Sequence, residues 1–190
     1  MPERPSGLKI RSVEILTHWL EDDGRVPNNP GLPLLIVPAA IDASAAGGLA
    51  RRIEEAYGAH GWGGIWRWGV YAYEHYHSCA HEVLTCCKGE ARIRFGGAAG
   101  PVVRVTPGDM VVIPAGVGHR NLASTDDFTV VGAYPPGQSP DLCLGRSGEI
   151  GAARLRIAAV PLPGEDPLFG AAGPLIRAWK PVPGAGRQPL

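Results

Sequence analysis

The sequence predicts an all-β fold, a sandwich or barrel of short strands. Its 27 glycines and 19 prolines are spread along 190 residues and do not collect in one tract. Between them lie short β-rich runs, LPLLIVPA, HEVLTCC, ARIRF, VVRV, DMVVIP and DFTVVGAY. Short strands with frequent turn residues are typical of sandwiches and barrels. At this length, and with no internal repeat at a fixed period, one domain with a single buried core is expected.

One segment departs from the strand pattern and predicts a helix. Over residues 49–58 the apolar side chains recur with the helical period. Asp42 or Ser44 would cap its start, and Gly58 or Gly61 would end it.

The predicted organisation has three parts within the one domain. Residues 1–60 form an N-terminal extension whose strands and helix pack on the barrel. Residues 61–160 form the β-barrel itself. Residues 161–190 form an irregular C-terminal tail rich in proline and glycine, and its last eight residues, 183–190, are expected to be disordered.

Composition excludes several classes of partner. The chain has 18 basic and 18 acidic residues and no long run of either sign, so no nucleic-acid or membrane footprint is predicted. Its start lacks an apolar signal core, and no apolar run approaches the length of a membrane span. We therefore expect a cytoplasmic protein. The four cysteines show no paired spacing and should be reduced: Cys79, Cys86, Cys87 and Cys143.

Residues 75–82, HYHSCAHE, are the densest group of chemically active side chains in the sequence. The aromatic run before them alternates like a strand, which places His75 and His77 on one face about 7 Å apart. After a short SCAH turn, the next strand would bring Glu82 back toward the same point. His81 has the opposite parity in that strand, so it should lie outside a shared metal site.

Two motifs with fixed spacing extend this group. The first is glycine, five residues, H-x-H, four residues, glutamate, six residues and glycine; the second is glycine, five residues, P-x-G, two residues and histidine. The matching residues are Gly69, His75, His77, Glu82 and Gly89, followed by Gly108, Pro114, Gly116 and His119.

These motifs resemble those of the cupin superfamily. The resemblance implies a double-stranded β-helix, or jelly-roll barrel. It also implies one divalent metal per chain, bound by His75, His77, Glu82 and His119. One position departs from the usual second motif: the asparagine expected four residues after the histidine is Ala123, and Asn121 stands two residues after it.

A narrower resemblance, to the YjlB-like single-domain cupins, covers most of the chain. The segments that carry it are DDGRVPNNPGLPLLIV, HGWGGIWRWGVYAYEHYHSCAHEVL, VVIPAGVGHRNL, FTVVGAYPPGQSPDL and VPLPGEDPLFGAAGPLIRAW. It supports the fold and the metal site and implies nothing specific about the substrate.

Three imidazoles and a carboxylate suit Fe, Ni, Zn, Mn, Co or Cu, and the sequence does not choose among them. Four protein ligands on an octahedral ion leave two positions for small molecules. Other readings stay open. Each histidine could be a hydrogen-bonded core residue, Cys79 could ligate zinc, and a His77–His81 pair would bind a metal if the segment were helical.

Strand parity also nominates residues for the cavity around the metal. Tyr73 shares the face of His75 and could act as an acid, base or orienting donor, with core packing as the alternative. Tyr71, Arg67 and Cys86 are nominated as substrate-binding residues, Arg67 only if Gly69 does not turn it away.

The opposite face of the same run is apolar and would need a cover. Trp66, Trp68, Val70 and Tyr76 fall on it. The cupin resemblance favours a homodimer that buries such a face.

Two classes of function remain after the sequence has been read. The first is a metal-dependent enzyme acting on a small molecule, of the dioxygenase, decarboxylase, isomerase or lyase type. The second is a non-catalytic cupin that binds a metal or small ligand, such as a sensor or a storage-type module. Open coordination positions favour the enzyme, because a structural site would be closed.

Overall fold

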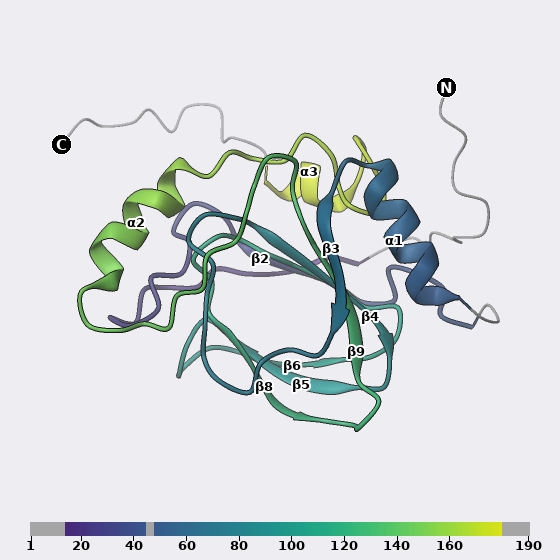
Figure 1. Ribbon diagram of the computed structural model, residues 1–190, viewed down its shortest axis with the longest axis horizontal. Helices are drawn as coiled ribbons and strands as arrows, with labels where there is room; N and C mark the ends of the chain where they lie inside the picture. Colours follow the sequence, from purple (N-terminus) through teal and green to yellow (C-terminus); the bar gives the residue numbers. More distant parts are fainter. Residues whose placement is uncertain (1–13, 45–47, 180–190) are drawn as a thin grey trace.

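The structure, a computed structural model, describes residues 14–44 and 48–179. Two antiparallel sheets face each other and form a jelly-roll barrel (Figure 1). The larger has the strand order β1-β2-β7-β4-β9-β3, and the smaller has the order β6-β5-β8. In chain order the strands are β1 (Leu16–His18), β2 (Leu34–Val37), β3 (Gly63–Trp68), β4 (Glu82–Lys88), β5 (Ala91–Phe95), β6 (Val102–Val105), β7 (Met110–Ile113), β8 (His119–Ser124) and β9 (Thr129–Tyr134).

Alternation along the strands of the larger sheet divides the core into two layers. In β4, Leu84 and Cys86 point between the sheets and pack with Ile93 of β5. Val83 points to the outer face, where it joins Ile53 of the helix in a second cluster. Glu82 has the parity of Leu84, so the alternation places its side chain inside the barrel.

Within residues 14–44 and 48–179, three helices flank the barrel, where the sequence predicted one. Helix α1 (Leu49–Ala59) confirms the predicted segment and covers the outer face of the larger sheet together with α3 (Pro174–Ala178) (Figure 1). Helix α2 (Glu149–Ala159) lies at one end of the barrel. The predicted cap of α1 was wrong. The residue before the helix is Gly48, whose backbone has a left-handed conformation, and no side chain caps the helix N-terminus.

One predicted strand ends earlier in the structure than the sequence suggested. The aromatic run is a strand only as far as Trp68, so the predicted continuous strand through residue 77 was wrong. Beyond it, His75 and Tyr76 make only isolated bridges, to His119 and Cys143. The segment before residue 61 supplies β1 and β2 to the larger sheet, and α3 interrupts the C-terminal tail. The predicted disorder of 183–190 concerns residues outside those described.

All four cysteines are free thiols, as predicted. Among the described residues, no helix is long and apolar enough to cross a membrane.

Candidate metal centre

Three histidines from two segments meet inside the barrel. His119 begins β8, and the irregular segment after β3 runs beside it, bound by hydrogen bonds between the backbones of His75 and His119. One ring nitrogen from each of His75, His77 and His119 lies within 4.8 Å of the other two. His75 and His119 are buried, and His77 is partly buried.

Each of these imidazoles is oriented by a backbone carbonyl. Nδ1 of His75 faces the carbonyl oxygen of Tyr73 at 3.2 Å, and Nδ1 of His119 faces that of Val117 at 3.2 Å. Nδ1 of His77 is hydrogen-bonded to the carbonyl of Asp141. A carbonyl can only accept, so the proton sits on Nδ1 and the lone pair of Nε2 is left for another partner. This is how metal-binding histidines are held in proteins.

Glu82 lies beside two of the three histidines, although it is not part of the group whose ligand atoms all lie within 4.8 Å of one another. Its side chain is 2% exposed, and its Oε2 lies 3.3 Å from Nε2 of His119 and 3.5 Å from Nε2 of His77. No hydrogen bond of acceptable geometry satisfies that oxygen. A buried carboxylate oxygen without a donor is costly, and a cation between these ligand atoms would satisfy it. The donor set therefore fits a divalent metal.

The electrostatics of the group show how strongly its members interact. Burial and the neighbouring His119 lower the pKa of His75 to about 3. Burial alone would also lower the pKa of His77, but the Glu82 carboxylate outweighs it and raises that pKa. For Glu82, burial is outweighed by His77 and His119, which hold the pKa of the carboxyl well below its usual range. Glu82 is thus an anion, the form that binds metals.

A polar network behind His77 holds its segment in place. The carboxylate of Asp141 accepts hydrogen bonds from the Ser78 amide at 2.6 Å and the Cys79 amide at 3.1 Å. Arg156 of α2 donates from Nε to the Ser78 hydroxyl at 2.6 Å and places Nη2 3.6 Å from Asp141 Oδ2. Burial alone would raise the pKa of Asp141, but the hydrogen bonds from Ser78 hold it at about 2.

The metal-ligand candidates lie in a cavity of about 440 Å³. This volume is within the ordinary range for small-molecule sites. Aromatic residues dominate the part of the wall nearest β3 and β9. The lining residues are Trp66, Arg67, Trp68, Gly69, Val70, Tyr71, His75, His77, Glu82, Leu84, His119, Tyr134, Pro140, Asp141 and Leu142.

Of the other residues that the sequence nominated for the cavity, some line it and others do not. Tyr71 lines the cavity, whereas Tyr73 is 45% exposed, lies outside the lining and stacks on Tyr71. Arg67 reaches the lining, but its guanidinium is paired with Glu54 of α1. The Cys86 thiol is buried in the core and donates to the carbonyl of Lys88, and burial raises its pKa to about 12. The roles suggested for these side chains remain predictions.

Two residues flagged as alternatives have other partners. Nδ1 of His81 accepts a hydrogen bond from the Ala115 amide at 2.9 Å, and the ring packs on Trp179. Cys79 lies beside Ser78 in the network behind His77. Neither belongs to the group of converging ligand atoms found among the described residues.

Sequence reasoning missed Tyr134, the last residue of β9. Its hydroxyl accepts a hydrogen bond from the Trp66 indole at 3.1 Å and lies beside Glu82, and its ring contacts His77 edge-on. Trp66 fits there because a Cβ on the facing Gly132 would lie 2.2 Å from its ring. The sequence did contain evidence for the inward position of Tyr134, because Val130, Gly132 and Tyr134 share one parity within the predicted strand DFTVVGAY.

Comparison with known proteins identifies the family. The cupin domain model matches residues 68–131. Over 166 residues, the chain is 44% identical to the uncharacterized protein YjlB of Bacillus subtilis (strain 168), a match that covers 87% of this chain and 97% of that protein. The chain is a YjlB-like cupin.

Solved structures similar to this cupin are more distant. A 4-keto-6-deoxy sugar epimerase of Streptomyces spheroides, NovW, is 16% identical with a TM-score of 0.39, covering 72% of this chain and 76% of its own. The DMSP lyase DddQ of Ruegeria pomeroyi is 19% identical with a TM-score of 0.34, covering 70% and 51%. An acireductone dioxygenase of Bacillus anthracis with cadmium in its active centre is 18% identical with a TM-score of 0.32, covering 50% and 59%.

Two cupin motif glycines have a clear structural reason. Gly108 has φ +97°, and a Cβ there would lie 2.5 Å from the Ile41 carbonyl oxygen. Gly116 has φ +90°, and a Cβ would lie 2.4 Å from the Asn28 carbonyl oxygen, while its amide binds the carbonyl of His77. Glycine adopts such conformations without strain, and Gly116 lies in the turn that leads to His119.

Proposed function

We propose that this cupin is a metal-dependent enzyme acting on a small molecule, with one divalent transition metal bound by His75, His77, Glu82 and His119. The observation that carries the proposal is the unsatisfied Oε2 of Glu82, which lies 3.3 and 3.5 Å from two imidazole nitrogens whose rings are already oriented from behind. Imidazole and carboxylate together suit Fe, Ni, Zn, Mn, Co or Cu.

A bound metal would supply Lewis-acid or redox chemistry at the end of the cavity. The chain's own residues do the remaining work. The backbone carbonyls behind His75 and His119 hold their rings, and the apolar wall that includes Leu84 and Leu142 keeps the site partly dry. Tyr134 has its oxygen occupied by the Trp66 indole, so its O–H proton is directed to an acceptor such as Glu82 or a ligand oxygen.

The cavity favours the enzyme class over a closed binding module. The three histidines and Glu82 all line a space of about 440 Å³ that a small molecule can enter. Structural metal sites are closed by protein ligands, whereas catalytic sites keep positions open. Reaction types of the dioxygenase, decarboxylase, isomerase and lyase classes all use such a site.

The test is metal binding by protein purified without chelator and then reloaded with one metal at a time. Wild-type protein should hold about one ion per chain, and at 100 times its Kd the metal should stabilise the fold by about 2.7 kcal/mol. His119→Ala and Glu82→Gln should each abolish or greatly weaken this binding and the thermal shift. His81→Phe is the matched control, a buried neighbour that should keep the full metal content.

Metal content measured by mass spectrometry and the midpoint of thermal unfolding give independent readings. Unchanged metal content in both His119→Ala and Glu82→Gln would contradict the proposal. A metal-loaded protein that turns over no member of a broad metabolite panel would favour the non-catalytic binding cupin.

A further inference from the structure

The wall of the cavity is aromatic on one side and rigid. Tyr71 contacts Trp68 edge-on with ring centres 5.7 Å apart, stacks on Tyr73 at 4.7 Å and meets His75 edge-on at 5.1 Å. With three ring neighbours, Tyr71 is fixed in orientation although it is 39% exposed. Trp68 is 66% exposed, which is unusual for the largest apolar side chain unless something covers it.

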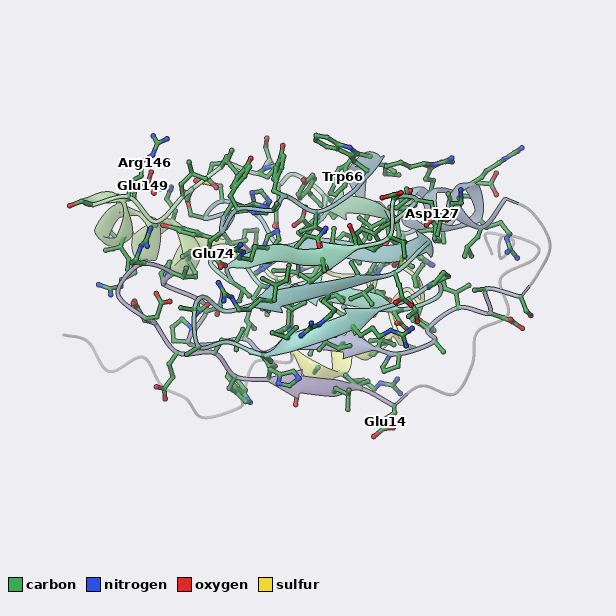
Figure 2. All side chains as sticks on the ribbon, turned by 90° about the horizontal axis from the view of Figure 1, so that it is seen from below. Glu14, Trp66, Glu74, Asp127, Arg146 and Glu149 are labelled. Atoms are coloured by element: carbon green, nitrogen blue, oxygen red, sulfur yellow. The ribbon has the colours of Figure 1, made fainter. Side chains whose placement is uncertain are left out.

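A second aromatic pair lies deeper in the cavity. Trp66 is positioned by Gly132, which leaves room for its ring, and its indole donates to the Tyr134 hydroxyl at 3.1 Å. Figure 2 shows Trp66 well separated from Arg146 and Glu149 at the α2 end, and the ring of its partner Tyr134 contacts His77 edge-on. The ring systems therefore run from the rim inward to the candidate metal ligands.

The charged residues of the cavity wall limit the kinds of ligand that the cavity can bind. Apart from the histidines, Arg67 is the single basic residue among the described residues that line it. Its guanidinium already binds both carboxylate oxygens of Glu54, with Nη2 2.6 Å from Oε2. Asp141 is likewise occupied by Ser78 and Arg156. In the metal-free state, no arginine or lysine among the described lining residues is thus left to pair with an anionic ligand.

We propose that the cavity binds an uncharged, planar small molecule that carries a hydrogen-bond-accepting oxygen. Its ring packs against Tyr71 and Trp68, and its oxygen faces the Tyr134 hydroxyl. This assignment deepens the proposed function, since the planar molecule would be the substrate of the metal centre. Planar rings gain from offset or edge-on contact with aromatic walls, and the cavity of about 440 Å³ lies within the size range of small-molecule sites.

Three probes of equal size separate shape from charge. Benzamide is planar and uncharged, cyclohexanecarboxamide has the same amide on a puckered ring, and benzoate has the same ring with a negative charge. Binding is measured by ligand-observed NMR on the full chain, both after chelator treatment and loaded with zinc. In both states benzamide should bind more tightly than cyclohexanecarboxamide, and in the metal-free state it should also bind more tightly than benzoate.

Two variants with matched controls test the wall. Trp68→Ala should weaken benzamide binding about 2- to 10-fold, the usual size of an aromatic pair, whereas Trp19→Ala, 64% exposed and outside this cavity, should not. Glu54→Gln should raise the affinity for benzoate several-fold by releasing Arg67. Glu55→Gln, which frees Arg51 from its i,i+4 ion pair within α1, should leave the benzoate affinity unchanged.

The outcomes separate this inference from the metal proposal, because metal content is measured on the same samples. If the wild-type protein binds no metal but still prefers benzamide, the metal centre is overturned and the aromatic site is supported. Equal binding of benzamide and cyclohexanecarboxamide, or equal effects of Trp68→Ala and Trp19→Ala, would overturn the inference. So would a change from dimer to monomer in Trp68→Ala with benzamide binding unaltered, since the rim would then be covered by a second copy of the chain.

Discussion

His81 and Glu82 are adjacent and equally buried, 1% and 2% exposed, yet they face opposite sides of the barrel wall. Inside, Glu82 has an oxygen without a hydrogen-bond donor and two imidazole nitrogens within 3.5 Å. Outside, His81 accepts the Ala115 amide and packs on Trp179. Burial is therefore not what marks a ligand. An unsatisfied atom is not sufficient either, because Nε2 of His81 is also buried without a hydrogen-bond partner. What distinguishes Glu82 is that its unsatisfied oxygen lies beside the ring nitrogens of two other candidate ligands.

The contrast extends to all four buried or half-buried histidines of the motif region. In His75, His77 and His119, Nδ1 faces a carbonyl, so Nε2 carries a lone pair toward the cavity. In His81, Nδ1 faces an amide donor, so the lone pair is used on the protein itself and Nε2 carries the proton. The backbone group behind each ring decides its tautomer and hence its capacity to bind a metal.

Among substitutions on the inner face, we expect the largest effect on metal affinity from a change in the network behind His77. Arg156→Met removes the donor to Ser78 Oγ and the charge beside Asp141, so the segment holding His77 should loosen. Changes in such supporting groups typically cost about 10- to 100-fold in metal affinity, and we expect a loss in that range by competition with a chelator dye.

Arg154→Met is the control for this experiment. Arg154 lies on the same helix and pairs with Asp22 at 2.5 Å, away from the histidines. Its loss should leave metal affinity unchanged. If both variants weaken metal binding equally, α2 acts through its general packing and the network has no special role.

On the outer face, His81→Phe should lower stability without lowering metal content. The Ala115 amide would lose its acceptor in a buried position, at a cost of about 1–3 kcal/mol. Urea denaturation of metal-free protein measures this loss, and mass spectrometry measures metal content. A His81→Phe protein that keeps its stability but loses the metal would erase the distinction between the two faces.

Much of this contrast could be predicted from the sequence, because it rests on local geometry. Alternation in HEVLTCC puts Glu82 and His81 on opposite faces, and the motif spacing brings His119 to the same place. The aromatic run was harder to predict. The strand ends at Trp68, so parity does not carry across Gly69: Trp66 packs in the inner cluster, while the guanidinium of Arg67 pairs with α1.

The residues and the helix that support the His77 segment are harder to predict from the sequence. Asp141 meets His77 across 64 positions, and Arg156 meets Ser78 across 78. No local pattern encodes such pairs. Helix α2 itself has a glycine before it, no side-chain cap and an exposed Leu155, so its apolar residues do not show a clear helical stripe. Tertiary contacts, and not periodicity, determine that part of the site.

The smallest effect separates two tyrosines, Tyr73 nominated by strand parity and Tyr134 placed by the structure. Tyr134→Phe removes an O–H whose oxygen is held by Trp66 beside Glu82. Losing that donor should weaken benzamide binding about 5-fold, the equivalent of about 1 kcal/mol. Tyr73→Phe keeps the ring that stacks on Tyr71 at 4.7 Å and should change the affinity by less than about 2-fold, within the scatter of surface substitutions. The reverse order would show that the Tyr73 hydroxyl reaches the ligand, and that the irregular segment after Trp68 closes inward when the cavity is filled.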